Sequence, residues 1–318
     1  MTNLTFNLSH RNPSTDLLES NPSGGGGSFT PTHAWNWNGL TNGAAINQSS
    51  PVYVSSASGY GALGNTAVTR NGHSSSLELK IRSGSDGLGG GTGGSDGMFG
   101  FQYYPATTSH PKVPKGQSMH FGFHIFIPTG FDFNAPGNDT LKFIRISQDQ
   151  TSQRLDIKVN NGQGVGGSTQ VGWFTADEEL TNGGQDVLYQ VGKPLNINDW
   201  NWVECKLIPS DDPNTYGLLY WCNDSLVFKI DGKNWTRYDN SDVATSGTFT
   251  NGMYNLNNAS ALVETMWFCT YWNGNAPQTQ SVYIDSGIYY TSATPSLPTT
   301  DSHGNPMIGS VAASVATL

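Results

Sequence analysis

Several stretches of the chain alternate apolar and polar residues with a period of two, the pattern of a β-strand with one buried face. The longest covers residues 119–127, where every second residue is large and apolar, so that His120 and His124 share the opposite face. Three further segments alternate in the same way: 77–81, 154–159 and 200–208. Because turn signals separate these segments and no strong amphipathic helix stands out, we predict an all-β sandwich or barrel.

The two ends of the chain differ in composition from its middle. Residues 1–34 are rich in Asn, Ser, Pro and Gly, and residues 293–318 are rich in Pro, Ser and Thr before ending in small, weakly apolar residues. We therefore predict a polar N-terminal arm over 1–34, one β-sandwich over 35–292 and a C-terminal tail over 293–318. Such compositions bury little apolar surface, so both arms should contribute little to the core.

The charge balance restricts the partners. The 318 residues carry 15 basic and 24 acidic side chains, a formal charge of −9, which argues against a broad basic field for nucleic acid or an anionic membrane surface. The overall charge does not exclude a local basic groove. The N-terminus does not have the pattern of a conventional secretion signal, and no segment is apolar enough to span a membrane. Three widely spaced cysteines indicate neither a disulfide framework nor a zinc site.

Five segments carry a resemblance to a known family: IFIPTGFDF and the following LKFIRI, then WNWVE, YWCNDSLVFKIDG and YIDSGIYYTS. Their order resembles the jelly-roll polysaccharide lyases of the concanavalin A-like superfamily, especially the alginate and glucuronan lyase-like families. The resemblance covers roughly residues 75–292. It implies a two-sheet antiparallel jelly-roll sandwich, here with extended polar arms at both ends. These lyases carry a Gly-Gly-Lys stretch after the FDF strand, whereas this chain has NAPGNDTLK, in which only Lys142 corresponds.

A polyuronate lyase must neutralise a uronate carboxylate, remove the C5 proton and protonate the leaving oxygen, which requires basic and phenolic side chains on one sheet face. If the protein is a lyase, the histidine pair and the basic pair of 154–158 should converge on one open groove, with a phenol in reach. Lys142 and Arg145 fall on opposite faces of their strand unless a bulge intervenes. A solvated histidine face without catalysis explains the same pattern. The catalytic candidates are His120, His124, Lys142, Arg145, Arg154, Lys158 and Tyr220.

Nine tryptophans and thirteen tyrosines exceed the needs of one core, and flat rings of this kind stack on sugars. Trp200 is the best groove candidate, because it alternates with apolar residues of its strand. The alternative is that the rings fill the space between two sheets. The carbohydrate-binding candidates are Trp200, Trp202, Trp221 and Trp272. No strand has the paired carboxylates of a retaining glucanase.

Asp285 is a weak candidate for a metal ligand. It resembles the closing-strand aspartate that supports a structural calcium in many jelly-roll sugar-binding domains. Calcium takes about six to eight oxygen ligands, and one aspartate does not establish a site. A turn-capping or salt-bridged aspartate is the alternative, and we expect no other cofactor.

Three functions stay open at this point. We favour a virion-associated structural or adhesive protein that displays a carbohydrate-binding jelly roll on a phage or virus particle, and is not an enzyme. The reasons are the low-charge Asn, Gly, Ser and Thr-rich composition, the polar arms and the odd cysteine count. The first alternative is a polysaccharide lyase that acts by β-elimination on a uronate-containing glycan, and the second is a stand-alone carbohydrate-binding module.

The favoured hypothesis implies specific partners. These are a polysaccharide or cell-surface glycan, and other virion proteins bound through the arms, with no nucleic acid and no membrane. We expect a homo-oligomer or assembly component with a virion or extracellular location.

Overall fold

A computed structural model describes ten stretches of the chain: 29–48, 52–87, 97–103, 112–135, 139–148, 154–160, 173–179, 187–189, 195–272 and 275–316. Within them only the backbone is described for residues 134–135, 139–140, 148, 160, 173–179, 187–189, 269–272 and 314–316. Nearly all regular structure in these ranges is β-strand, with one short helix, α1 (Ser310–Ala316). No helix in these ranges is long and apolar enough to cross a membrane.

Eleven strands of the described chain form the large sheet, in which all neighbours pair antiparallel. Their spatial order is β18 (Ala244–Thr248), β17 (Asn234–Tyr238), β16 (Ser225–Asp231), β15 (Gly217–Cys222), β14 (Trp200–Ile208), β8 (Ser118–Phe126), β20 (Gln280–Ser292), β5 (Ser76–Ile81), β4 (Tyr60–Asn65) and β3 (Ser56–Ala57), with β1 (His33–Asn36) also paired to β20.

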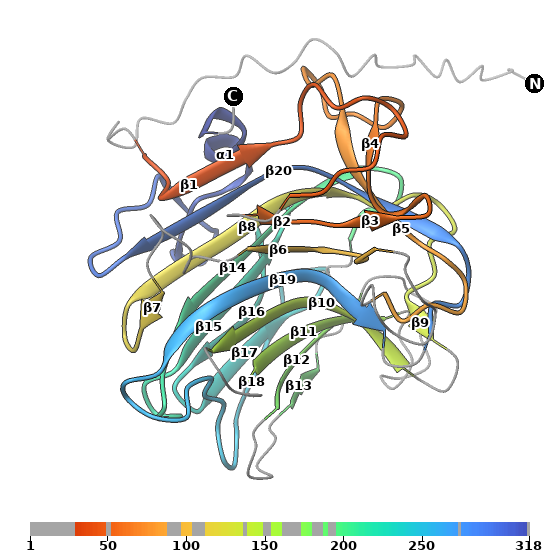
Figure 1. Ribbon diagram of the computed structural model, residues 1–318. Helices are drawn as coiled ribbons and strands as arrows, with labels where there is room; N and C mark the ends of the chain where they lie inside the picture. Colours follow the sequence, from red (N-terminus) through yellow and green to blue (C-terminus); the bar gives the residue numbers. More distant parts are fainter. Residues whose placement is uncertain are drawn as a thin grey trace, which may run out of the picture.

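Nine described strands form the small sheet, which is antiparallel as well. Their order is β13 (Val187–Tyr189), β12 (Trp173–Glu179), β11 (Arg154–Asn160), β10 (Asp139–Gln148), β19 (Leu262–Trp272), β6 (Phe101–Tyr103) and β2 (Val52–Tyr53), with β7 (Val113–Pro114) beside β19 and β9 (Asn134–Ala135) beside β10. Figure 1 shows β19, β10, β11 and β12 as neighbouring strands of this layer. Strands that are distant in sequence are thus neighbours in both sheets, and the predicted two-sheet antiparallel jelly-roll sandwich is confirmed.

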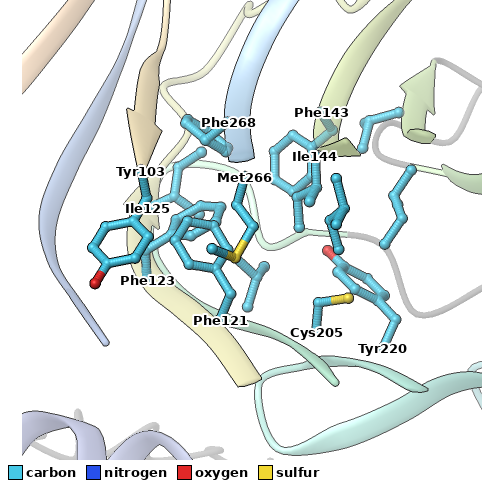
Figure 2. Close-up of a cluster of buried hydrophobic side chains, with 14 of the residues drawn as sticks. Tyr103, Phe121, Phe123, Ile125, Phe143, Ile144, Cys205, Tyr220, Met266 and Phe268 are labelled. Carbon is cyan, nitrogen blue, oxygen red and sulfur yellow. The ribbon is translucent and has the colours of Figure 1, made fainter. Parts of the chain in front are cut away.

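The core lies between the two sheets and is rich in aromatic rings. Phe123 of β8 lies between Phe121 of the same strand and Phe268 of β19, with a distance of 4.3 Å between the ring centroids of Phe123 and Phe268. Figure 2 shows these rings together with Phe143 and Ile144 of β10. The alternation in the sequence predicted which residues of β8 face inward, because each strand of a sandwich buries one face.

Tryptophans lie over glycines of neighbouring strands in the described large sheet: Trp235 over Gly247, and the two pairs described next. Trp35 of β1 is in register with Gly287 of β20, and a Cβ atom at this glycine would lie 2.2 Å from the indole. Gly122 of β8 lies below the indole of Trp202, where a Cβ atom would be 2.5 Å away. Only glycine leaves room for these rings, so both positions require it.

The C-terminal residues 297–313, called the strap below, lie on the outer face of the large sheet. Met307 and Ile308 are buried, and the strap residue Asp301 accepts a hydrogen bond of 2.8 Å from Nε1 of Trp221. Figure 1 shows α1, at the end of the strap, next to β20 and β1. We expected the tail to contribute little to the core. No described residue of the strap belongs to the core between the two sheets. On the outer face, however, its few apolar residues form separate clusters that cover tryptophans of the large sheet.

Candidate functional site

The outer face of the small sheet carries a group of basic side chains, which we call the cationic face: Lys142, Arg145, Arg154 and Lys158, together with Asp156. Its geometry depends on an irregularity in β10. Between Lys142 and Ile144 the register with β11 shifts by one residue, so that Phe143 is the extra residue of a β-bulge. Phe143 and Ile144 both enter the core, and Arg145 therefore returns to the face of Lys142.

Asp156 lies at the centre of the cationic face. Its carboxylate accepts two hydrogen bonds from Arg145, 2.6 Å from Nε to Oδ1 and 2.9 Å from Nη2 to Oδ2. Nζ of Lys142 lies 3.5 Å from Oδ2, and Nε of Arg154 lies 3.6 Å from the same oxygen. The two parallel hydrogen bonds fix the plane of the Arg145 guanidinium. A guanidinium held in a fixed plane is well suited to recognise carboxylates.

The charges around Asp156 determine its protonation. Burial alone would raise the pKa of this carboxyl, because it disfavours the charged form. The hydrogen bonds and charge of Arg145, together with the charges of Lys142 and Arg154, outweigh burial and lower the pKa below its ordinary value. Asp156 is therefore ionised at neutral pH, and it carries one negative charge among several positive ones.

The neighbouring strands extend this face with polar and aromatic residues. Trp267 of β19 is in register with Arg145, and Gln102 of β6 is in register with Trp267. The indole of Trp267 is partly exposed, whereas Gln102 is buried. Further along β19, the backbone of Tyr271 occupies the register position opposite Lys142. The row thus combines cations, an amide and the flat ring of an indole, which suits a ligand that carries carboxylates on sugar rings.

The histidine pair lies elsewhere. His120 and His124 are on the outer face of the large sheet, where they are almost completely buried. Nδ1 of His120 lies 3.0 Å from Oε1 of Glu204, and Nδ1 of His124 lies 2.9 Å from the hydroxyl of Ser286. Burial, with the charges of nearby cations, lowers the pKa of His124 to about 3, so it is a weak base. The expectation that the histidines and the basic residues converge on one groove is wrong, because they project from opposite faces of the sandwich.

The strap explains why the histidines are buried. Glu204 of β14 accepts hydrogen bonds from the backbone amides of Ile308, at 2.9 Å, and Gly309, at 3.0 Å. The Nε1 atom of Trp202 donates to the same carboxylate at 3.3 Å. These contacts fasten the strap over the histidine face. A carboxylate at position 204 was visible in the sequence, but its role depends on a segment about one hundred residues away.

The phenol and indole candidates also differ from their predicted positions. Tyr220 points into the core, where its ring stacks on Phe228 at 5.5 Å, so it cannot act as an acid in an open groove (Figure 2). Trp202 and Trp221 are buried under the strap and offer no face to a sugar. Trp200 is partly exposed, with its Nε1 bonded to the carbonyl of Thr69 at 3.1 Å, and remains a candidate. The side chain of the fourth candidate, Trp272, lies outside the described residues.

Asp285 is a salt-bridged aspartate. Its carboxylate contacts Nε of Arg70 at 2.5 Å and Nδ1 of His73 at 2.6 Å, and it is fully buried. Both oxygens therefore face cationic or donor groups, which does not fit a calcium ligand. No group of three or more His, Cys, Asp or Glu side chains is arranged to hold a metal in the described part of the chain.

Comparisons with known proteins find similarity in structure and none in sequence. No family model and no curated protein sequence matches the chain. The similar solved structures include an alginate lyase from Aplysia kurodai (11% identity, TM-score 0.48, 83% of this chain and 100% of that chain). They also include an endo-β-1,4-glucuronan lyase from Trichoderma reesei (12%, 0.41, 83% and 96%) and the catalytic domain of β-agarase D from Zobellia galactanivorans (8%, 0.43, 82% and 93%).

The sequence resemblance to jelly-roll polysaccharide lyases thus agrees with the kind of structure that the comparison returns. At these identities and TM-scores the likeness does not assign an activity to this chain. The functional argument depends on the geometry of the cationic face.

Proposed function

We propose that the protein is a polysaccharide lyase whose cationic face binds a uronate-containing glycan and cleaves it by β-elimination. The observation that carries this proposal is the bulge at Phe143, which gathers Lys142 and Arg145 on one face beside Arg154. From the alternation in the sequence alone, Lys142 and Arg145 were expected on opposite faces of their strand. The solved lyase structures named above make the proposal consistent with the fold, and they do not supply its argument.

The reaction needs three things from the protein. Cations must neutralise the carboxylate attached to C5, so that the proton on C5 becomes acidic. A base then removes this proton, the C4–O4 bond breaks, a double bond forms between C4 and C5, and a proton passes to the leaving O4. The guanidinium of Arg145, oriented by Asp156, and the charges of Lys142 and Arg154 supply the first requirement.

The proton-transfer group is assigned by position. The backbone of Tyr271 in β19 occupies the register position opposite Lys142, so the sequence of this strand provides a tyrosine next to a cationic position. We assign both proton transfers to this residue, which takes the proton from C5 and passes it to the leaving O4, in place of Tyr220, which is in the core.

The test is the absorbance of unsaturated uronate products. The purified protein is incubated with polymannuronate, polyguluronate and glucuronan, and with neutral amylose as a substrate control. We expect rising absorbance with at least one acidic polymer. Lys142→Gln should reduce turnover by about two to three orders of magnitude, the usual loss when one group that stabilises developing charge is removed. Tyr271→Phe should act in the same direction, and Lys115→Gln, at a partly exposed ion pair with Asp211, should leave turnover unchanged.

The absence of absorbance with all acidic polymers would contradict the lyase proposal. So would full activity of Lys142→Gln in a protein that unfolds at the same urea concentration as the wild type. The expected virion location, the partners of the arms and the oligomeric assembly stay predictions, since they rest on composition alone.

A further inference from the structure

A cleft with a volume of about 260 Å³ lies on the outer face of the large sheet, between β16, β17 and the strap. This face points away from the small sheet and from the cationic face. The volume is just below the range of about 300 to 1,000 Å³ that is typical of small-molecule sites. Six of the residues that line it are Lys229, Asp231, Asn234, Thr236, Tyr238 and His303.

One wall of the cleft is aromatic and held in place. The imidazole of His303 stacks on the ring of Tyr238, with 4.2 Å between the ring centroids and 30° between their planes. Nε2 of His303 lies 3.1 Å from Oδ2 of Asp242, which fixes the orientation of the imidazole. Tyr238 packs underneath against the buried Met307 cluster, so the pair is a preformed flat surface.

The remaining walls offer hydrogen-bond donors and acceptors side by side. Lys229 is in register with Thr236, and Asp231 is in register with Asn234, so the four side chains form two adjacent rows. Nζ of Lys229 is 4.0 Å from the carboxylate of Asp231, too far for a hydrogen bond between them. Both side chains are accessible, with 37% and 80% of their surface exposed. A cation, a carboxylate, an amide and a hydroxyl at this spacing match the vicinal hydroxyls of a sugar ring.

We propose that this cleft is a second glycan-binding site, which takes one or two sugar residues of a polysaccharide through their vicinal hydroxyls and the His303 ring. The site goes beyond the proposed lyase function, because it needs no chemistry and lies on the opposite face of the sandwich. A polymer bound there is held to the protein while another of its segments reaches the cationic face.

Titration calorimetry with two hexasaccharides tests the site, one of neutral glucose units (cellohexaose) and one of glucuronate units. The protein carries Lys142→Gln, so that the acidic probe is not cleaved. We expect binding of at least one probe, weakened about tenfold or more by His303→Ala and by Asn234→Ala. Asn240→Ala, in the exposed turn after β17, is the matched control and should bind as before. Urea unfolding of each variant shows whether the strap has remained in place.

The two probes show whether the cleft prefers an acidic or a neutral sugar. Tighter binding of the glucuronate probe that is lost with Lys229→Gln identifies an acidic sugar, and similar binding of both probes identifies a neutral one. Unchanged affinity in folded His303→Ala and Asn234→Ala, or no binding of either probe at millimolar concentration, would overturn the proposal. A failure of the lyase assay leaves this result unaffected, because binding at the cleft is measured without turnover.

Discussion

Replacing Glu204 by Gln tests how the strap is fastened to the large sheet. Glu204 is fully buried, and four donors surround its two oxygens. Oε1 accepts from Nδ1 of His120 and from the amide of Ile308, and Oε2 accepts from Nε1 of Trp202 and from the amide of Gly309. A glutamine of nearly the same shape has one oxygen and one NH₂ group, so it cannot accept all four bonds.

The structure indicates which bond is lost. If the NH₂ group replaced Oε2, two obligate donors, Trp202 and Gly309, would face it. If it replaces Oε1, His120 can change its tautomer and accept, so that only the amide of Ile308 loses its partner. A buried amide left unpaired costs about 1 to 3 kcal/mol, and the bonds to the remaining oxygen lose their charge assistance. We therefore expect a loss of about 2 to 4 kcal/mol in the free energy of unfolding.

Urea denaturation followed by tryptophan fluorescence measures this loss, and hydrogen exchange locates it. Peptides from residues 299–313 should exchange faster in Glu204→Gln, while peptides from β8 keep their protection. Glu78→Gln is the matched control. Within the described residues this partly buried carboxylate accepts bonds from the side chains of Asn65 and Ser281 and none from the backbone, so the change should alter stability by about 1 kcal/mol or less. An unchanged midpoint together with unchanged exchange of the strap would refute the assignment of Glu204 as its anchor.

Three further substitutions test the packing and the site. Asp156→Asn should reduce the free energy of unfolding in urea by about 3 kcal/mol at neutral pH, because it leaves buried cations without their carboxylate. Since the pKa of Asp156 is lowered, its contribution is present above the ordinary carboxyl pKa of 3.8 and is lost as the pH falls through the folded value. The difference from the wild type should therefore narrow in acid, and a constant difference would contradict the pKa direction. Gly122→Ala should cost about 1 to 3 kcal/mol in the same assay, because the new methyl group meets the Trp202 indole. His124→Asn should leave lyase turnover, compared at equal amounts of folded protein, within about threefold of the wild type. A loss as large as that expected for Lys142→Gln would contradict the placement of the site on the cationic face.

The sequence predicts the faces of single strands well. Alternation assigned the inward and outward residues of β8, β11 and β14 correctly, because the period of two is a local property of an extended chain. It does not say which sheet a strand joins. β8 belongs to the large sheet and β11 to the small sheet, so His124 and Arg154 face away from each other although both are outward residues.

The covered tryptophans were missed for a related reason. Trp202 and Trp221 alternate with residues of the core between the sheets and therefore project outward, and the sequence made both of them sugar-binding candidates. The residues that cover them belong to a segment rich in Pro, Ser and Thr, whose composition indicates a tail. A few contacts, such as those of Met307 and Asp301, are enough to fix this segment on the sheet, and no local pattern reveals them.

The bulge at Phe143 links the chemistry of the cationic face to the packing of the core. The extra residue places an additional ring among the core aromatics, with 4.9 Å between the centroids of Phe143 and Phe268. The same insertion returns Arg145 to the outer face, where Asp156 holds it. A regular strand would have put either Lys142 or Arg145 into the apolar interior, at the cost of a buried unpaired charge. The core contacts of Phe143 therefore stabilise the register on which the proposed uronate site depends.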